Sequence, residues 1–131
     1  ANALYGVGLA LDLTLRDVQQ KLKDKGQPWE RAKAFDGACP VSSFTSLDGS
    51  AELDNLDFSL TINDEVRQQG NTKMMMRGAL SLLCAISEVF TLQPGDIVLT
   101  GTPKGVGPLH PGDSLQLKMA PWFDIHTRVG E

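Results

Sequence analysis

The stretch Tyr5–Lys33 reads YGVGLALDLTLRDVQQKLKDKGQPWERAK, and the period of its apolar residues changes part-way along. Over residues 5–13, bulky apolar side chains alternate with glycine, alanine and aspartate, which is the period of a β-strand. Gly6 and Gly8 leave one face of this strand nearly bare, so another backbone or a ligand can come close to it. The bare face ends at Asp12, whose carboxylate is therefore placed to bind a hard cation.

A helix is predicted after this strand. Thr14 and Asp17 resemble a capping pair at its start, and Gly26 and Pro28 end it. Between these signals the apolar residues recur at three- and four-residue steps, which is a helical period. They are Leu15, Val18 and Leu22.

Three polar side chains converge where the strand meets the helix. Arg16 and Gln19 lie on one face of the first helical turns, close to the point where Asp12 leaves the strand. Two interpretations remain open at this point. The three groups form a ligand-binding site, or Asp12 pairs with Arg16 in a purely structural ion pair without a metal.

The composition suits a single globular domain, with 131 residues of which 41% are hydrophobic and 21% charged. A net charge of -4 and the absence of a basic run with interleaved aromatics argue against a nucleic-acid partner. The longest apolar tract, residues 79–90, is too short and too polar to span a bilayer, and the first residues lack the form of a secretion signal. We expect a soluble cytoplasmic protein without a membrane partner.

Lys33 is flanked by small and aromatic residues, Ala32, Ala34 and Phe35. A lysine in such surroundings is partly buried, in which case it pairs with an anion or loses its proton. The alternative, an exposed lysine on a loop, remains equally open from these neighbours.

A hairpin and a helix are predicted in the middle of the chain. Residues 56–62 alternate like a strand with one wet face, and residues 63–65 turn into a second strand. Thr72 then caps a helix of about four turns, whose apolar stripe packs on the sheet as core.

The last third of the chain alternates turns and strands. Pro94-Gly95-Asp96 and Pro111-Gly112-Asp113 are near-identical tight turns, which lead into predicted strands at 97–100 and 115–119. Two such turns so close together favour a rolled or barrel-like sheet over βαβ winding.

The segment between them, residues 100–108, has three glycines in seven residues but no G-K-[ST] sequence, and its prolines exclude the helix of a phosphate loop. It is a loop whose amides and Thr102 hydroxyl approach a small anion, or a glycine-rich crossover.

Three long motifs resemble the fumarylacetoacetate hydrolase superfamily, in particular its small acylpyruvate hydrolase branch. They are LDLTLRDVQ at 11–19, GQPWERAKAFDGACPVS at 26–42 and PGDIVLTGTPKGVGP at 94–108. The resemblance covers almost the whole chain. It implies an α+β, mainly β fold, a mixed β-sandwich roll with a few short helices. It also implies Mg²⁺ or Mn²⁺ as cofactor, a homodimer, and short 2-oxo acids as substrates.

Carried over by position, Asp12 resembles the metal ligand and Lys33 the catalytic lysine beside the metal. Arg16 and Gln19 resemble substrate-holding residues, and Thr102, with Gly101 before it, the contact to the substrate carboxylate. The family's other two metal ligands form a Glu-x-Glu pair on an upstream strand. The nearest imitation in this chain is Glu52 with Asp54. Residues 1–131 are therefore expected to form a single catalytic domain that lacks its N-terminal part.

Three functions follow from the resemblance. The first is hydrolysis of a carbon-carbon bond in 3-acylpyruvates or fumarylpyruvate-like acids, in which the metal and Lys33 stabilise an enolate, water attacks the distal carbonyl and pyruvate leaves. The second keeps the enolate but decarboxylates or tautomerises oxaloacetate, or isomerises an unsaturated 2-oxo diacid. The third is a catalytically silent fragment or binding subunit, because one aspartate is a poor cage for Mg²⁺.

Overall fold

The computed structural model describes residues 4–47 and 50–130, without the side chains of 50–52. The chain divides into two compact units, and each is described by itself. Unit 1 consists of Ala1–Val7 and Thr45–Glu131, and unit 2 of Gly8–Phe44. The predicted single domain stays a prediction.

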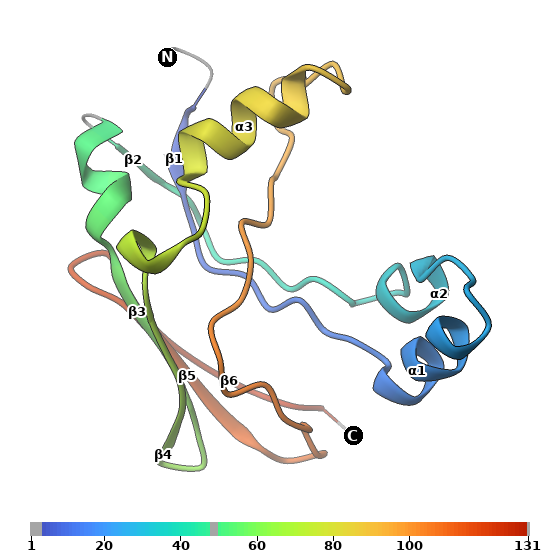
Figure 1. Ribbon diagram of the computed structural model, residues 1–131. Helices are drawn as coiled ribbons and strands as arrows, with labels where there is room; N and C mark the ends of the chain where they lie inside the picture. The colour runs from blue at the N-terminus through green and yellow to red at the C-terminus, as the bar shows by residue number, and fades with distance from the viewer. Residues whose placement is uncertain (1–3, 48–49, 131) are drawn as a thin grey trace. The chain divides into compact units, whose positions relative to one another are not determined.

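A four-stranded antiparallel sheet forms the body of unit 1 (Figure 1), with strand order β4-β3-β5-β6. Its strands are β3 (Asp57–Ile62), β4 (Glu65–Asn71), β5 (Ser114–Met119) and β6 (Phe123–Arg128). Two further strands, β1 (Gly6–Val7) and β2 (Thr45–Ser46), pair separately. A Cβ on Gly6 would overlap the carbonyl oxygen of Thr45, so the predicted bare face does admit another backbone here.

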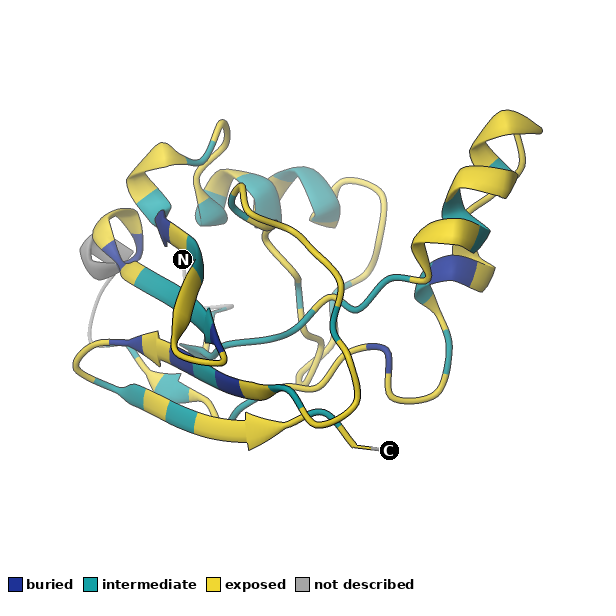
Figure 2. Ribbon diagram, turned by 90° about the horizontal axis from the view of Figure 1, so that it is seen from below, coloured by how far each residue is buried: buried dark blue, intermediate teal, exposed yellow. Residues whose placement is uncertain are grey.

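The core of unit 1 lies on one face of this sheet. In β5 every second side chain is buried, which is the strand period, and Figure 2 shows these residues in dark blue along the sheet. The buried apolar residues of unit 1 are Leu53, Leu56, Ile62, Leu115, Leu117 and Met119. The predicted strands at 56–62 and 115–119 are therefore confirmed.

The turn between β3 and β4 is also a joint between two hairpins. Asn63 and Asp64 have positive φ angles of 48° and 66°, as a two-residue turn of the I′ type requires. The side-chain oxygen of Asn63 accepts the Ser114 N–H at 2.9 Å, and its Nδ2 donates to Oδ1 of Asp113 at 2.8 Å. The backbone N–H of His110 and this Asn63 amide hold the pKa of the Asp113 carboxyl below its ordinary value.

The two proline-glycine-aspartate turns are alike, as predicted. Asp96 accepts the Gln93 N–H at 2.7 Å, and Asp113 accepts the His110 N–H at 2.8 Å. The strand predicted at 97–100 is wrong, because this segment has no regular structure. The first turn does not place it beside a neighbouring strand, whereas β5 pairs on both sides.

The helix predicted from Thr72 is divided into two shorter helices, η2 (Thr72–Met74) and α3 (Ala79–Ser87). A further 3-10 helix, η1 (Ser50–Asn55), precedes β3 and was not predicted. Asn71 caps η2 by accepting the Lys73 N–H at 2.9 Å, whereas Thr72 accepts the Leu56 N–H at 2.8 Å. No residue of α3 is buried, so the prediction of its stripe as core is wrong for this unit.

Unit 2 consists of two extended arms and two helices, α1 (Arg16–Asp24) and α2 (Glu30–Lys33). The strand predicted over 5–13 is reduced to β1 and an isolated bridge between Ala10 and Val41. The ladder is incomplete partly because Pro40 has no N–H to donate. Helix α1 is confirmed, but the predicted cap is wrong, because the helix begins after Leu15 without a side-chain cap.

The predicted fold class, a mainly β α+β fold with few short helices, is thus confirmed. In the part of the chain that the structure describes, no helix is both long and apolar enough to cross a membrane.

Replacing Gly105 by alanine should destabilise the protein more than replacing Gly95. Both glycines have a positive φ, 102° and 97°, which costs an alanine about 1–3 kcal/mol. A Cβ on Gly105 would also overlap the carbonyl oxygen of Arg67, whereas one on Gly95 meets no atom within 4 Å among the described residues. Chemical unfolding of both variants measures the difference. Equal losses would show that the loop is free to move away from β4.

Asp113 should make stability depend on pH. Its folded-state pKa is lowered, so its contribution is present above the ordinary value of 3.8 and is lost as the pH falls through the folded-state pKa. Asp113→Asn should be less stable than wild type at neutral pH, and the difference should shrink in acid. Unfolding curves across this range test it, with Asp64→Asn as a control from the adjoining turn between β3 and β4. A difference that stays constant with pH would contradict the assignment.

Candidate active site

The centre of the candidate site is an ion pair between Asp12 and Lys33. Nζ of Lys33 lies 2.9 Å from Oδ2 of Asp12, and the two side chains are 34% and 41% exposed. The structure thus decides between the alternatives for the Lys33 side chain, whereas the ligand-binding role of Asp12 stays a prediction. Lys33 is half-buried and paired with an anion, and the ion partner of Asp12 is Lys33, not Arg16.

Backbone hydrogen bonds between the arms of unit 2 place this pair. The N–H of Leu13 donates to the Ala38 oxygen at 2.9 Å, and the N–H of Leu15 to the Ala32 oxygen at 3.0 Å. Ala32 has no exposed surface, so the short helix α2 lies firmly against the start of α1. Lys33 directly follows Ala32 in α2, so this packing brings its side chain close to Asp12.

Arg16 and Gln19 form a second polar pair on the first turns of α1. Nη1 of Arg16 donates to Oε1 of Gln19 at 3.0 Å, as their three-residue spacing predicts. The Arg16 side chain is exposed, and its remaining N–H groups suit a carboxylate. Unit 2 therefore holds four of the predicted site residues in two hydrogen-bonded pairs.

Thr102 and Gly101 belong to unit 1 and lie in the glycine-rich loop. Both residues are exposed, and Gly101 has a φ of 115°, a conformation that favours glycine. This loop lies along β4, because Nε2 of Gln68 donates to the Pro103 oxygen at 3.0 Å. Gln68 was not predicted, because no local pattern links it to a partner 35 residues away. The assignment of Thr102 to substrate binding stays a prediction.

Among the described residues, the predicted metal ligand Asp12 has the chemical type that Mg²⁺ or Mn²⁺ prefers, but it is one ligand where such an ion needs several. The Asp12 carboxylate is the hard oxygen ligand that these ions prefer. Among the described residues, no three histidine, cysteine, aspartate or glutamate side chains come together in a group that could hold a metal ion. Asp54 is exposed at the end of η1, and the Glu52 side chain lies outside the described residues.

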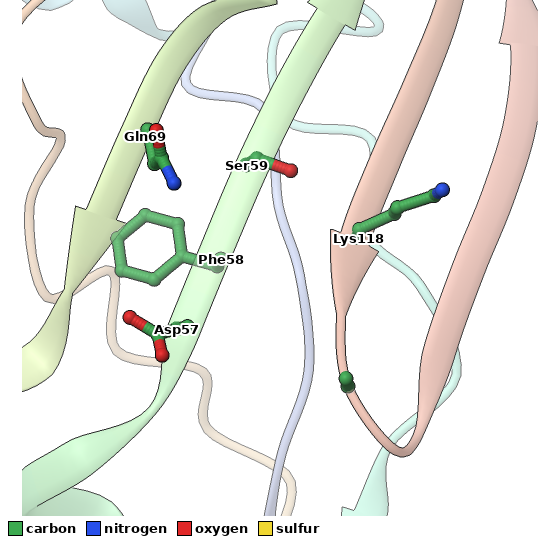
Figure 3. A pocket seen from close by; sticks show the side chains of 6 residues that line it. Asp57, Phe58, Ser59, Gln69 and Lys118 are labelled. Atoms are coloured by element: carbon green, nitrogen blue, oxygen red, sulfur yellow. The ribbon is translucent and has the colours of Figure 1, made fainter.

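A shallow hollow of about 160 Å³ lies on the sheet of unit 1 (Figure 3). Phe58 of β3 and Gln69 of β4 line it from adjacent strands, and Lys118 of β5 stands at its far side. The complete lining is Asp57, Phe58, Ser59, Gln69, Lys118 and Ala120. None of the sequence-predicted site residues is among them.

The sequence was compared with models of known protein families. The family model for the C-terminal part of fumarylacetoacetate (FAA) hydrolase matches residues 1–130. The chain belongs to the fumarylacetoacetate hydrolase family. The family predicted from the three motifs is therefore confirmed.

Within the fumarylacetoacetate hydrolase family, several curated relatives are named for oxaloacetate chemistry. Oxaloacetate tautomerase of Escherichia coli is 51% identical over 96% of this chain and 56% of its own length. The mitochondrial oxaloacetate tautomerase of Bos taurus is 45% identical over 85% of this chain and 50% of its length. A mitochondrial oxaloacetate decarboxylase of Dictyostelium discoideum is 40% identical over 85% and 51%. The chain spans about half the length of these relatives.

Solved structures confirm the fold type. A fumarylacetoacetate hydrolase family protein from Yersinia pestis is 50% identical with a TM-score of 0.91, over 95% of this chain and 59% of that one. The fumarylpyruvate hydrolase of Pseudomonas aeruginosa is 30% identical with a TM-score of 0.90, over 96% and 54%. Its crystal structure is a complex with Mn²⁺ and pyruvate. A divalent metal is thus found with a member of this family.

The Asp12–Lys33 pair should contribute little to stability. Because both side chains are partly exposed, a double-mutant cycle of Asp12→Asn and Lys33→Met should give a coupling of about 0.2–1 kcal/mol. The matched control is Asp17 and Lys21, 3.9 Å apart and 74% and 76% exposed, for which we expect less. Unfolding of the single and double variants measures both couplings. A coupling of several kcal/mol would show that the pair is shielded from water.

Proposed function

We propose that the protein acts on oxaloacetate and interconverts its enol and keto forms. The observation that carries this proposal is the 51% identity with an oxaloacetate tautomerase across 96% of the chain. The Asp12–Lys33 pair supports it, because it offers a cation at a place suited to an enolate oxygen.

The comparisons favour the second of the three sequence-based functions over the first. Relatives at 40–51% identity are named for oxaloacetate, whereas the fumarylpyruvate hydrolase structure is 30% identical. Hydrolysis of acylpyruvates remains the second candidate on the strength of that structure. All these substrates are short 2-oxo acids that form an enolate, so one site serves either reaction.

The chemistry of tautomerisation needs a proton to move between C3 and the oxygen on C2. In the direction from keto to enol, the C3–H proton passes to a base from the solvent, and the electron pair of that bond forms the C2–C3 double bond. The carbonyl oxygen becomes negative and then takes a proton back from the solvent. The Lys33 ammonium would stabilise this charge, and more strongly where the bound substrate displaces water from the partly exposed pair. Asp12 holds the ammonium in place by accepting one of its hydrogen bonds.

We further propose that Asp12 supplies one ligand to a divalent cation, Mg²⁺ or Mn²⁺. When bound, such an ion would polarise the 2-oxo group as a Lewis acid. The remaining ligands would be oxygen atoms other than those of the side chains described in this structure. Lys33 would then have two anionic neighbours, the substrate oxygen and Asp12.

The substrate's carboxylates would be held by the remaining predicted residues. Arg16 has the planar, charged fork that carboxylates bind best, and Gln19 fixes its direction. Thr102 and the amide at Gly101 are proposed to bind a carboxylate through neutral donors. A homodimer is part of the proposal, as the resemblance implies.

The proposal predicts metal-dependent acceleration of oxaloacetate enol decay by the intact protein, followed by ultraviolet absorbance. Lys33→Met and Asp12→Asn should each lower kcat/KM by about 100-fold or more, because the enolate charge loses its stabilisation. Lys21→Met, which removes an exposed lysine of α1, should keep full activity. A chelator should abolish the activity, and added Mn²⁺ should restore it.

Product assays separate the other functions. Pyruvate released from oxaloacetate would indicate a decarboxylase, and loss of acetylpyruvate absorbance would indicate the hydrolase. Wild-type protein that is folded, metal-loaded and inactive on both compounds would support the silent binding subunit. Unchanged activity of Lys33→Met would remove Lys33 from the mechanism.

A further inference from the structure

The glycine-rich loop that carries Thr102 has no regular structure of its own, yet a side-chain hydrogen bond ties it to strand β4. Nε2 of Gln68 donates to the carbonyl oxygen of Pro103 at 3.0 Å, and the bond is part-buried. Pro103 has no N–H, so this oxygen is its one backbone group for hydrogen bonding. Gln68 therefore sets the orientation of the Pro103–Lys104 peptide, one residue beyond Thr102.

A β-bulge in β4 aims Gln68 at the loop. Thr61 pairs with Val66 but Leu60 pairs with Gln68, so Arg67 is an extra residue in the strand. Such bulges bend a strand and redirect the side chains beside them. The carbonyl of the extra residue, Arg67, points at the loop as well, as its contact with Gly105 shows.

Contacts at two glycines keep the loop close enough for this hydrogen bond. A Cβ on Gly105 would overlap the Arg67 carbonyl oxygen, and one on Gly107 would lie 3.6 Å from Nη2 of Arg67. These distances show that the loop backbone lies directly against Arg67 of β4, within reach of Gln68. The Thr102 side chain nevertheless stays exposed. A fixed backbone with a free hydroxyl is what a ligand contact requires.

We infer that Gln68 is a positioning residue, which acts through Pro103 to hold Thr102 in its substrate-binding orientation. The inference rests on the proposed function, because it takes Thr102 as a contact to a carboxylate of oxaloacetate. Gln68 itself touches no substrate in this proposal. Its effect is to remove the conformational cost of ordering the loop when substrate binds.

Gln69 is the matched control on the same strand. Successive side chains of a strand point to opposite faces, and Gln69 lines the hollow shown in Figure 3 instead of meeting the loop. Gln68→Met and Gln69→Met thus remove the same amide from adjacent positions. Only the first should affect the loop.

Steady-state kinetics of the intact, metal-loaded protein test the inference. Gln68→Met should raise KM for oxaloacetate about tenfold with a change in kcat below about twofold, whereas Gln69→Met should change neither. In a Thr102→Val background, Gln68→Met should have almost no further effect, because the contact that it positions is already gone. Full additivity of the two losses, or equal kinetics of Gln68→Met and Gln69→Met, would overturn the inference.

Two further measurements separate this inference from the proposed function. Backbone amides at 101–107 should exchange with solvent faster in Gln68→Met than in wild type, and unchanged exchange would overturn the positioning role in any case. If wild type does not act on oxaloacetate, the proposed function fails. In that case, calorimetry measures the binding of oxalate, a small dicarboxylate, to wild type, Gln68→Met and Gln69→Met. Weaker binding by Gln68→Met alone supports the positioning role of Gln68. Equal binding by the three proteins overturns it.

Discussion

Backbone hydrogen bonds, among them those from Leu13 to Ala38 and from Leu15 to Ala32, hold the arms of unit 2 together. The candidate site depends on them. Asp12 and Lys33 are 21 residues apart, and their partly exposed ion pair is too weak to close that loop alone. Backbone groups and the buried Ala32 hold the arms together, and the charged side chains meet because the arms are already in contact. Asp12 and Lys33 are therefore not needed to hold the arms together, and their side chains are available for a role in binding or catalysis.

The site was predictable where local spacing determines it. Arg16 and Gln19 pair because three residues bring side chains together on any helix. Asp12 stood out because it ends a bare strand face. The partnership of Asp12 with Lys33 could not be predicted from spacing, because it depends on α2, a helix of four residues that is too short to show a period. Gln68 was missed for a similar reason, since a strand glutamine gives no sign of the carbonyl that it will meet.

The fold was predictable where alternation or turn chemistry was strong. The hairpin at Asn63 and strand β5 show both signals, and both are present. The segment 97–100 is as apolar as a strand but has no adjacent partner, and a strand requires hydrogen-bonding neighbours that a local window does not contain. Strand β6 was overlooked because its alternation begins directly after Pro121 and Trp122 and ends in polar residues. The predicted site residues could not distinguish oxaloacetate from acylpyruvates as the substrate, since the reactions of both pass through the same kind of enolate.

The Asn63 side chain uses its oxygen and its nitrogen in different bonds, to Ser114 and to Asp113. This arrangement makes the turn sensitive to chemical ageing. Deamidation would convert the donor that faces Asp113 into a second carboxylate at a position where the two groups are now 2.8 Å apart. Two like charges at such a distance repel, so one slow covalent change at a single exposed turn would loosen the joint between both hairpins of the sheet.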